Sequence, residues 1–361
     1  MRTVLVFEDS SRANFGGGQK MTLMVCDILK EQYNLRFVDF SDSTRYVQIV
    51  RDQYGDGSLI SIGHGEIKGH TGIWTWLKMM ILSSLCIITD AKKILKGLNK
   101  EDCISYSTGK RSLLIASFLK WRYGIPYIQH AHLVENLHRA YFKLARILFL
   151  GADSVLCVSK TVMDSINTPN CKLVYNPSLN ERGYKGGKKD NKFVVAFVGS
   201  LIPIKGVENF VDAAKLCPRN IEFRVYGEGT LRQSLEERAA GCVRFMGFES
   251  NIIERYYENI DVIVVPTILQ EALPLVVVDA KSVGLPCIVT MPGGQAEIVR
   301  DGIDGYHVPM KNPAAIAEAV VRLTSDIDNY NIMSKASYDS FKIFAYGQFK
   351  ALISETFSHW S

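Results

Sequence analysis

Two carboxylates in the second half of the chain are the residues whose types and spacing most directly suggest chemistry. Glu271 and Asp279 bracket the run EALPLVVVD, in which Glu271 falls in a loop and Asp279 falls one to two turns into a helix expected at 275–282. Both side chains can therefore face one ligand. Carboxylates accept hydrogen bonds from neighbouring hydroxyls, so Glu271 suits a transferred sugar and Asp279 a ribose. From the spacing alone, an unrelated surface glutamate and helical aspartate would be the better interpretation.

A lysine in a loop between a strand and a helix is the second chemical feature. The strand expected at 193–198 is followed by Gly199 and Ser200, and a helix begins near Gly206, directly after Lys205. A helix start presents unpaired backbone NH groups and the positive end of the helix dipole, to which the lysine adds a mobile cation. Together they predict a diphosphate site. The backbone of the segment after Glu271 is expected near the same phosphates, at Ala272, Leu273, Pro274 and Leu275. Taken alone, strand, loop and helix with one lysine is a common pattern.

Strands and helices alternate along the chain, which indicates parallel sheets covered by helices. In the first half we expect strands at 3–7, 35–40, 126–129, 154–158 and 172–175 and helices at 21–31, 112–122 and 137–150. The pattern restarts with strands at 193–198, 221–226, 243–246, 261–266 and 286–289 and helices at 206–216, 231–238, 275–282 and 314–324. A ligand of such a fold binds outside the carboxyl ends of the strands.

A polar stretch separates the two halves. Residues 180–192 read NERGYKGGKKDNK, a glycine-containing, lysine-rich composition that is typical of a linker. The sequence therefore predicts an α/β protein with a Rossmann-like domain at 1–178, a linker at 179–192 and a second Rossmann-like domain at 193–340. Residues 341–361 are expected to form a C-terminal helix that packs back toward the N-terminal domain.

Size and composition suit two ordinary globular domains. The chain has 361 residues, of which 47% are hydrophobic and 22% are charged. Its net charge of +5 is uneven, because residues 1–178 carry 22 basic and 15 acidic side chains whereas residues 179–361 carry 20 and 22. The basic first half favours an anionic partner, such as a membrane surface, a lipid pyrophosphate or a nucleic acid, about as well as a merely solvated surface.

Cysteine usage and the longest apolar run bear on the compartment. Eight scattered cysteines, none spaced as CxxC, are typical of buried free thiols and predict a reducing cytoplasm without a zinc site. The first residues enter a strand directly, so we expect no signal peptide. The apolar run at 73–88 is shorter than the ~20 residues of a membrane span. With Trp74 and Trp76 it fits a core helix or an amphipathic helix at a membrane interface.

The motifs of the second half occur in an order that resembles a known family. Residues 193 to about 325 resemble the donor domain of the family 4 retaining glycosyltransferases, which have the GT-B fold. The matching segments are VG at 198–199, KG at 205–206, YGEG at 226–229, FMG at 245–247, 261–266, 271–280, GLP at 284–286, GG at 293–294 with Glu297, and Gly302 with Gly305. No single segment is specific, but all of them in one order are hard to produce by chance.

The first half resembles the acceptor domain of the same family more loosely. Gly17 and Gly18 are similar to its glycine loop near the donor phosphates, and the strand that leads to His130 and His132 is similar to one that ends in the family's active-site histidine. By its position after Pro126, His132 matches that histidine best, with His130 as the alternative. A lone histidine is more often structural, so this role rests on the resemblance.

The resemblance implies a retaining glycosyltransferase whose two Rossmann-like domains face each other across a cleft that holds the active site. Lys205 would neutralise the diphosphate of a nucleotide-sugar donor, Glu271 would orient the sugar and His132 would contact it. Asp279 would bind the ribose, and the phosphates would lie against Gly17, Gly18, Gly199 and Ser200. No metal or cofactor is implied, because cations and helix dipoles stabilise the departing diphosphate, which helps to deprotonate the acceptor.

Two positions depart from the family pattern. Ser200 stands where the family often has arginine, so the diphosphate site loses one cation and Lys205 carries more of the charge. Asp279 stands where the family usually has a second glutamate, which keeps the acid but shortens its reach. Because Lys205 and Glu271 are present, neither departure predicts loss of activity.

The acceptor is less well defined than the donor site. A cytoplasmic enzyme with a basic first half suits a lipid-linked saccharide at the inner face of the cytoplasmic membrane, where the protein would bind peripherally. We therefore expect a role in bacterial surface polysaccharide synthesis, such as the O-antigen of lipopolysaccharide or capsule, with no nucleic acid partner. A soluble acceptor stays open.

Other functions fit parts of the sequence. A sugar-nucleotide 2-epimerase shares the fold and the donor, but the glutamate–aspartate pair fits transfer better. A non-catalytic GT-B subunit of a polysaccharide assembly complex would fit Ser200, whereas the lysine and glutamate argue against it. The segment STGKRS at 107–112 lacks the leading glycine of a phosphate-loop NTPase, and GGG at 16–18 is not the GxGxxG of a dehydrogenase. Asp326 and Asp328 have the spacing of a metal-binding DxD motif, but their polar surroundings favour a solvated helix cap.

Overall fold

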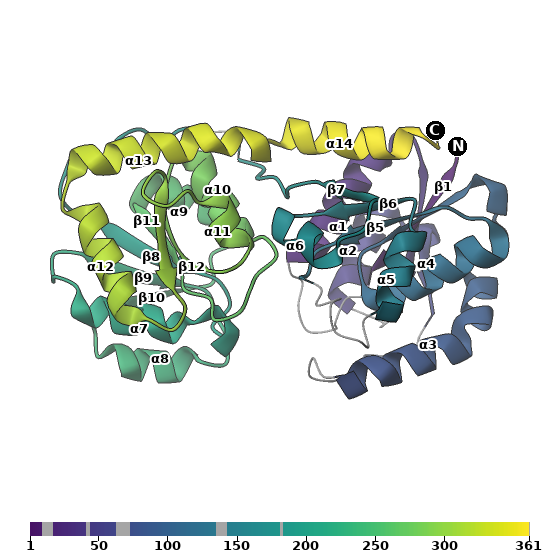
Figure 1. Cartoon of the computed structure of the whole chain (residues 1–361), viewed down its shortest axis with the longest axis horizontal. Coiled ribbons are helices and arrows are strands. Elements are labelled where there is room, and N and C mark those ends of the chain that lie inside the picture. Colours follow the sequence, from purple (N-terminus) through teal and green to yellow (C-terminus); the bar gives the residue numbers. More distant parts are fainter. Residues whose placement is uncertain (9–16, 41–43, 63–72, 135–142, 181–182, 361) are drawn as a thin grey trace. The chain divides into compact units, whose positions relative to one another are not determined.

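The chain folds into two compact units (Figure 1). The computed structural model describes residues 1–8, 17–40, 44–62, 73–134, 143–180 and 183–360. The first unit comprises residues 1–174 and 349–361, and the second comprises residues 175–348. Each contains one sheet, and every strand pairing in both sheets is parallel. This confirms the α/β class with two Rossmann-like units that the alternation of strands and helices predicts.

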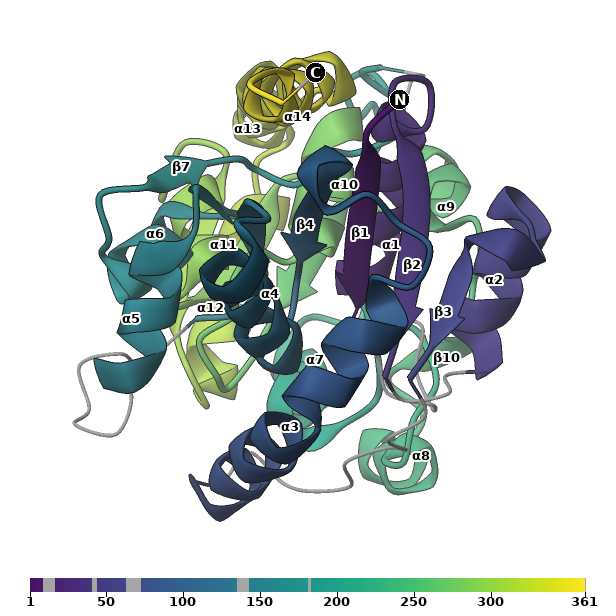
Figure 2. The same cartoon turned by 90° about the vertical axis from the view of Figure 1, so that its right-hand side faces the viewer.

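The first unit is built on a seven-stranded sheet. In spatial order its strands are β3 (Leu59–Ser61), β2 (Asn34–Asp39), β1 (Thr3–Glu8), β4 (Cys103–Ser107), β5 (Tyr127–Ala131), β6 (Ser154–Cys157) and β7 (Cys171–Leu173). Its helices are α1 (Gly17–Leu29), α2 (Thr44–Tyr54), α3 (Ile73–Ile94), α4 (Lys110–Tyr123), α5 (Lys143–Gly151) and α6 (Lys160–Ile166). Figure 2 shows α3 and α4 in front of the strands and α1 behind them. Because helices cover both faces, a central strand such as β1 is buried along its whole length.

The second unit is built on a six-stranded sheet. In spatial order its strands are β10 (Arg244–Gly247), β9 (Glu222–Tyr226), β8 (Val194–Val198), β11 (Val262–Val265), β12 (Cys287–Met291) and β13 (Gly305–Pro309). Its helices are α7 (Val207–Leu216), α8 (Arg232–Ala239), α9 (Ile252–Asn259), α10 (Leu275–Val283), α11 (Gly294–Ile298), α12 (Pro313–Thr324) and α13 (Ile327–Ser340). The strand order reverses between β8 and β11 here, and between β1 and β4 in the first sheet. Such reversals are the points at which open parallel sheets bind ligands.

The last helix, α14 (Tyr346–Ser358), begins in the second unit, and from Phe349 onward it belongs to the first. Phe357 is buried, and its backbone oxygen accepts a hydrogen bond from the Tyr33 hydroxyl at 2.9 Å. The ring centroids of Phe357 and Tyr33 are 6.0 Å apart, and those of Phe357 and Tyr106 are 6.1 Å apart. The end of the chain is therefore part of the core of the first unit.

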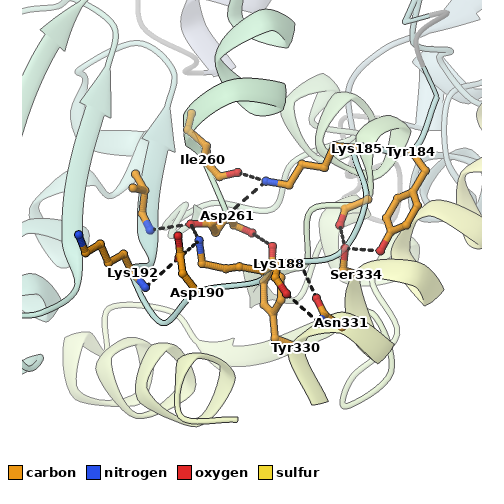
Figure 3. A network of polar contacts seen from close by, with 12 residues as sticks. Tyr184, Lys185, Lys188, Asp190, Lys192, Ile260, Asp261, Tyr330, Asn331 and Ser334 are labelled. Carbon is orange, nitrogen blue, oxygen red and sulfur yellow. Dashed lines mark hydrogen bonds and ion pairs between the residues drawn. The ribbon is translucent and has the colours of Figure 1, made fainter. Parts of the chain in front are cut away.

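The segment with a linker-like composition is held on the second unit by polar contacts around Asp261 (Figure 3). The Asp261 carboxylate accepts a hydrogen bond from the Val194 amide at 2.9 Å and lies 3.4 Å from Lys185 Nζ and 3.1 Å from Lys188 Nζ. Burial lowers the pKa of Lys185, although the charge of Asp261 opposes the shift. Two of the four lysines in residues 183–192, Lys185 and Lys188, are thus partners of one buried carboxylate.

Helix α3 extends beyond the apolar run at 73–88. It exposes Ile81, Leu85 and Ile88, which follow one another at helical spacing. The side chains of Trp74 and Trp76 lie outside the described residues. Among the helices that the structure describes, none combines the length and the apolar composition needed to cross a bilayer.

The contacts of Asp261 make a prediction about stability. Asp261→Ala removes the shared partner of Lys185, Lys188 and the Val194 amide. We expect the free energy of unfolding of the second unit to fall by about 3–5 kcal/mol, because buried cations lose their counter-charge. All four tryptophans belong to the first unit, so tryptophan fluorescence follows that unit during denaturation in urea, and far-UV circular dichroism follows both.

Asp190→Ala is the matched control. Asp190 also pairs with Lys188, at 3.1 Å, but its side chain is 68% exposed and water screens the pair. We expect this variant to unfold like the wild type. If Asp261→Ala unfolded at the same urea concentration as Asp190→Ala, the structural role assigned to Asp261 would be wrong.

Candidate functional site

Loops at the carboxyl edge of the second sheet form the candidate site. All strands run in the same direction, so the loops after β8, β9, β11 and β12 leave from one edge. Backbone hydrogen bonds join these loops to one another: Leu201 to Glu228 at 2.9 Å, Ile268 to Ile204 at 3.1 Å, and Gly294 to Glu271 at 2.8 Å. The backbone at this edge is therefore one connected framework.

Lys205 and Glu271, which separate motifs predicted, lie together in this framework. Lys205 ends a short 3-10 turn after β8, and Glu271 lies in the loop between β11 and α10. Lys205 Nζ donates to Glu271 Oε1 at 2.9 Å, and the two side chains are 34% and 17% exposed. The pair is thus partly open to solvent. It offers a cation to an anionic group and a carboxylate to hydroxyl groups within one site.

Two glycines allow the loops to approach this closely. Gly206 has a φ of 66°, and a Cβ there would lie 2.0 Å from the backbone oxygen of Pro266. A Cβ at Gly294 would lie 1.7 Å from the backbone oxygen of Ala272. A side chain at Gly206 would push the Lys205 loop away from the loop after β11, and one at Gly294 would displace the segment that follows Glu271.

The segment after Glu271 leads directly into α10. Leu273 and Pro274 are buried, Pro274 immediately precedes the helix, and Leu275 is its first residue. Buried side chains therefore anchor the start of this nine-residue helix next to the lysine–glutamate pair. The helix start contributes unpaired backbone NH groups and the positive end of its dipole at this edge of the sheet.

Gly199 and Ser200 follow β8 at the same edge. The Gly199 amide donates to the Tyr226 oxygen at 3.0 Å, and a Cβ at Gly227 would lie 1.9 Å from the Gly199 oxygen. The loops after β8 and β9 are thus packed backbone against backbone. Ser200 itself is exposed, so its hydroxyl is accessible to a ligand.

Two acidic side chains of the second unit, Asp279 and Glu297, accept hydrogen bonds from hydroxyl groups in the segment at 175–178. Asp279, on α10, accepts a hydrogen bond from the Ser178 hydroxyl at 2.6 Å. Glu297, on α11, accepts one from the Tyr175 hydroxyl at 2.7 Å. A ribose hydroxyl bound by Asp279 would therefore share the carboxylate with Ser178. Neither hydroxyl partner could be found from the sequence, because Ser178 and Tyr175 stand in no motif with the acids.

Thr267 is a further residue of the site that sequence reasoning missed. Its hydroxyl donates to the Ile204 oxygen at 2.9 Å and so ties the loop after β11 to the loop that carries Lys205. The Thr290 hydroxyl donates in turn to the Thr267 oxygen at 2.7 Å. A single threonine after a strand carries no spacing signal, so only the tertiary structure reveals this role.

In the first unit, the two candidate histidines lie side by side at the carboxyl end of β5. Their ring centroids are 4.1 Å apart. His130 is fully buried, whereas His132 is partly exposed. Burial lowers the pKa of His132 to about 4, and burial together with the neighbouring His132 lowers the pKa of His130 well below its usual value. Both rings are therefore neutral at pH 7, and His132 can exchange hydrogen bonds with a neutral hydroxyl.

Gly17 and Gly18 begin α1, and both are exposed. Residues 9–16, which include the first glycine of the triplet, lie outside the described part of the chain. Glu8, at the carboxyl end of β1, has a structural role that the sequence does not predict. It is buried, and its Oε2 accepts hydrogen bonds from the hydroxyls of Thr22 at 2.6 Å and Thr108 at 3.1 Å. Glu8 thus ties α1 to the loop after β4.

The arrangement of His, Cys, Asp and Glu side chains indicates where a metal ion could bind. Within the described residues, no group of three or more His, Cys, Asp or Glu side chains is arranged to hold a metal ion. Asp326 precedes α13, and its Oδ1 accepts hydrogen bonds from the amides of Asp328 at 3.0 Å and Asn329 at 3.1 Å. The DxD sequence is therefore a helix cap, as its polar surroundings favoured.

Comparisons with known proteins agree with this architecture. Residues 192–326 match the family model described as glycosyl transferases group 1. The chain is 28% identical over 293 residues to UDP-Gal:alpha-D-GlcNAc-diphosphoundecaprenol alpha-1,3-galactosyltransferase of Escherichia coli. This alignment covers 70% of this chain and 75% of that protein. It is 25% identical over 283 residues to N,N'-diacetylbacillosaminyl-diphospho-undecaprenol alpha-1,3-N-acetylgalactosaminyltransferase of Campylobacter jejuni, which covers 69% and 74%.

A solved structure extends the likeness over the whole chain. The crystal structure of Anabaena HepE in complex with UDP and glucose matches with a TM-score of 0.73 at 17% identity, over 99% of this chain and 100% of that chain. At this identity the likeness shows the fold, which is GT-B. The expected fold is thereby confirmed.

The close backbone approach at Gly294 makes a second prediction. Gly294→Ala places a methyl group against the Ala272 oxygen, so the loop that carries Glu271 must shift. We expect the free energy of unfolding of the second unit to fall by about 1–3 kcal/mol, measured in urea by circular dichroism. Gly347→Ala is the control, because no atom lies within 4 Å of a Cβ there. Equal stability of the two variants would show that the Gly294 loop tolerates a side chain.

Proposed function

We propose that this chain transfers a sugar with retention of anomeric configuration. The premise is that it is a glycosyltransferase of the GT-B type in the family glycosyl transferases group 1. The donor is a nucleoside-diphosphate-sugar and the acceptor is a lipid-linked saccharide. The contact between Lys205 and Glu271, 2.9 Å from Nζ to Oε1, is the observation that carries the proposal. It supplies a cation for the diphosphate and an acceptor for the sugar hydroxyls at the start of a helix.

The proposed reaction needs no covalent intermediate on the protein and no bound metal. The bond between the anomeric carbon and the β-phosphate oxygen breaks, and the acceptor oxygen attaches to the same face of that carbon. The proton of the acceptor hydroxyl passes to the departing phosphate oxygen. Lys205 and the positive end of α10 stabilise the negative charge that develops on the diphosphate. Glu271 binds the sugar and keeps the ammonium group of Lys205 close to it.

The remaining residues take supporting roles in this proposal. His132 contacts the transferred sugar as a neutral imidazole, which its lowered pKa of about 4 favours. Asp279 binds the ribose together with the Ser178 hydroxyl that already orients its carboxylate. Gly17 and Gly18 let backbone NH groups at the start of α1 approach the phosphates.

The acceptor class is inferred from relatives and from charge. The names of the Escherichia coli and Campylobacter jejuni relatives both state an acceptor sugar linked through a diphosphate to undecaprenol. Such a substrate is anionic and lies in a membrane, and residues 1–178 carry the excess of basic side chains. We therefore place the protein peripherally at the inner face of the cytoplasmic membrane, in the synthesis of a bacterial surface polysaccharide such as O-antigen or capsule.

Turnover with defined substrates tests the proposed activity. The full chain is incubated with UDP-, GDP-, ADP- and dTDP-sugars in the presence of EDTA, with GlcNAc-diphosphoundecaprenol or a lipid extract as acceptor. Release of nucleoside diphosphate should require the acceptor. Lys205→Ala and Glu271→Ala should each lower kcat by about 100-fold or more, because each removes a group that stabilises the transition state. Lys215→Ala is the control, because this α7 lysine pairs with Asp212 on the same helix, away from the loop of Lys205.

Other outcomes of the same assay identify other functions. Conversion of the donor to an isomer without acceptor would identify a sugar-nucleotide 2-epimerase. Donor binding without turnover on any acceptor would favour a non-catalytic subunit. Activity that EDTA abolishes and Mg²⁺ restores would refute the metal-independent part of the proposal.

The stereochemical outcome is a separate prediction. With an α-linked donor, the new glycosidic bond should also be α, because the acceptor approaches the face that the phosphate leaves. The coupling between H1 and H2 of the transferred sugar in the proton NMR spectrum of the product distinguishes the two anomers. A β-linked product would establish an inverting transferase and remove the same-face mechanism.

A further inference from the structure

We propose that His130 is a positioning residue for His132, and that Tyr106, packed against Phe357, holds the His130 ring, so that the last helix of the chain orients the active-site histidine. This inference rests on the role proposed above for His132. All four residues belong to the first unit, so the argument needs only contacts within that unit.

The two histidines are coupled through their rings. His130 is the fourth residue of β5 and His132 follows the end of the strand, so the two side chains leave the same face of the sheet. The ring centroids are 4.1 Å apart with an angle of 39° between the planes. The His132 ring therefore rests against the His130 ring, and any rotation of His130 must displace it.

The neighbouring strand holds His130 through a hydrogen bond. Tyr106, on β4, has its hydroxyl oxygen 2.6 Å from His130 Nδ1, and both side chains are fully buried. Burial raises the pKa of the Tyr106 hydroxyl, to which Cys26 and Glu8 contribute, and lowers the pKa of the His130 imidazole. A protonated phenol can donate to an unprotonated imidazole nitrogen or accept from a protonated one. In the proposed arrangement Tyr106 donates to Nδ1, and His130 is the tautomer that carries its hydrogen on Nε2.

The last helix, α14, packs against Tyr106 through Phe357. The centroid of the Phe357 ring lies 6.1 Å from that of the Tyr106 ring, and Phe357 is 1% exposed. The Tyr33 hydroxyl fixes Phe357 by donating to its backbone oxygen at 2.9 Å. A continuous series of contacts thus runs from α14 through Tyr106 and His130 to His132.

Simple packing does not explain a histidine at position 130. Its Nε2 is buried, and the residues that the structure describes give it no hydrogen-bond partner. A buried polar group without a partner destabilises the fold, and a phenylalanine would fill similar space without that cost. The Nδ1 atom, which receives the Tyr106 hydroxyl, is what distinguishes histidine from phenylalanine here.

NMR of the full chain labelled with ¹⁵N-histidine tests the inference directly. The chain has seven histidines, and single substitutions assign their ring nitrogens. In the wild type, His130 should be the tautomer protonated at Nε2. Tyr106→Phe should allow both tautomers and shift the signals of His132. Phe357→Leu should shift the signals of both histidines.

Turnover of the same variants gives a second readout. Tyr106→Phe and His130→Phe should lower kcat by about 10- to 100-fold, because a misplaced contact to the reacting sugar slows transfer, while KM for the donor changes less than about two-fold. His130→Asn, whose amide oxygen can accept from Tyr106, should retain more of the kcat than His130→Phe.

Tyr127→Phe is the matched control. Tyr127 is a buried tyrosine of β5 whose hydroxyl donates to the Leu148 oxygen instead of a histidine, so His132 signals and kcat should not change. The inference is overturned if wild-type His130 is protonated at Nδ1, or if His132 signals are unchanged in Tyr106→Phe and His130→Phe. Full activity of His132→Ala would refute the role of His132 in the proposed function, while the NMR signals would still decide whether His130 positions it.

Discussion

Parallel strand pairing is the constraint on which the rest of this structure depends. Parallel strands must be joined by crossover connections, so helices cover both faces and every strand ends at the same edge as its neighbours. At the point where the strand order reverses, loops from two adjacent strands turn away to opposite faces and leave room between them. Lys205 follows β8 and Glu271 follows β11, and these two strands are neighbours at that reversal in the second sheet. The contact between the two side chains is thus a consequence of strand order.

Buried charged groups fix the elements at the opposite edge of this sheet, where the strands begin. Asp261, which immediately precedes β11, binds two lysines and a backbone amide. Lys281 on α10 pairs at 3.1 Å with Asp304, which immediately precedes β13, and both side chains are fully buried. Arg300 also binds Asp304, at 2.7 Å. Each of these carboxylates joins segments far apart in the sequence. Because an unpaired buried charge is costly, such contacts hold the segments in one arrangement more strictly than apolar packing alone.

The success of sequence-based prediction differed between elements for physical reasons. The apolar strand expected at 193–198 corresponds to β8, and the helix expected at 275–282 corresponds to α10, because their patterns are local. In contrast, β4 was not expected, since its serines interrupt the apolar run. Ser107 is nevertheless buried, because its hydroxyl donates to Gln129 Oε1 at 2.7 Å on the adjacent strand. A polar side chain can occupy a buried strand only when it has a hydrogen-bond partner, here on the neighbouring strand. The sequence of a single segment does not reveal that partner.

The sequence by itself determined the class of fold, the order of its loops and the chemical types at the candidate site, because alternation, glycine positions and the lysine and glutamate motifs are all local patterns. The tertiary structure alone decided which side chains are partners. Asp279 binds Ser178, 101 positions away, Lys185 pairs with Asp261, 76 positions away, and Tyr106 meets His130, 24 positions away. Such pairs depend on strand register and on how helices pack across the sheets, and neither is encoded in the spacing of the residues along the chain.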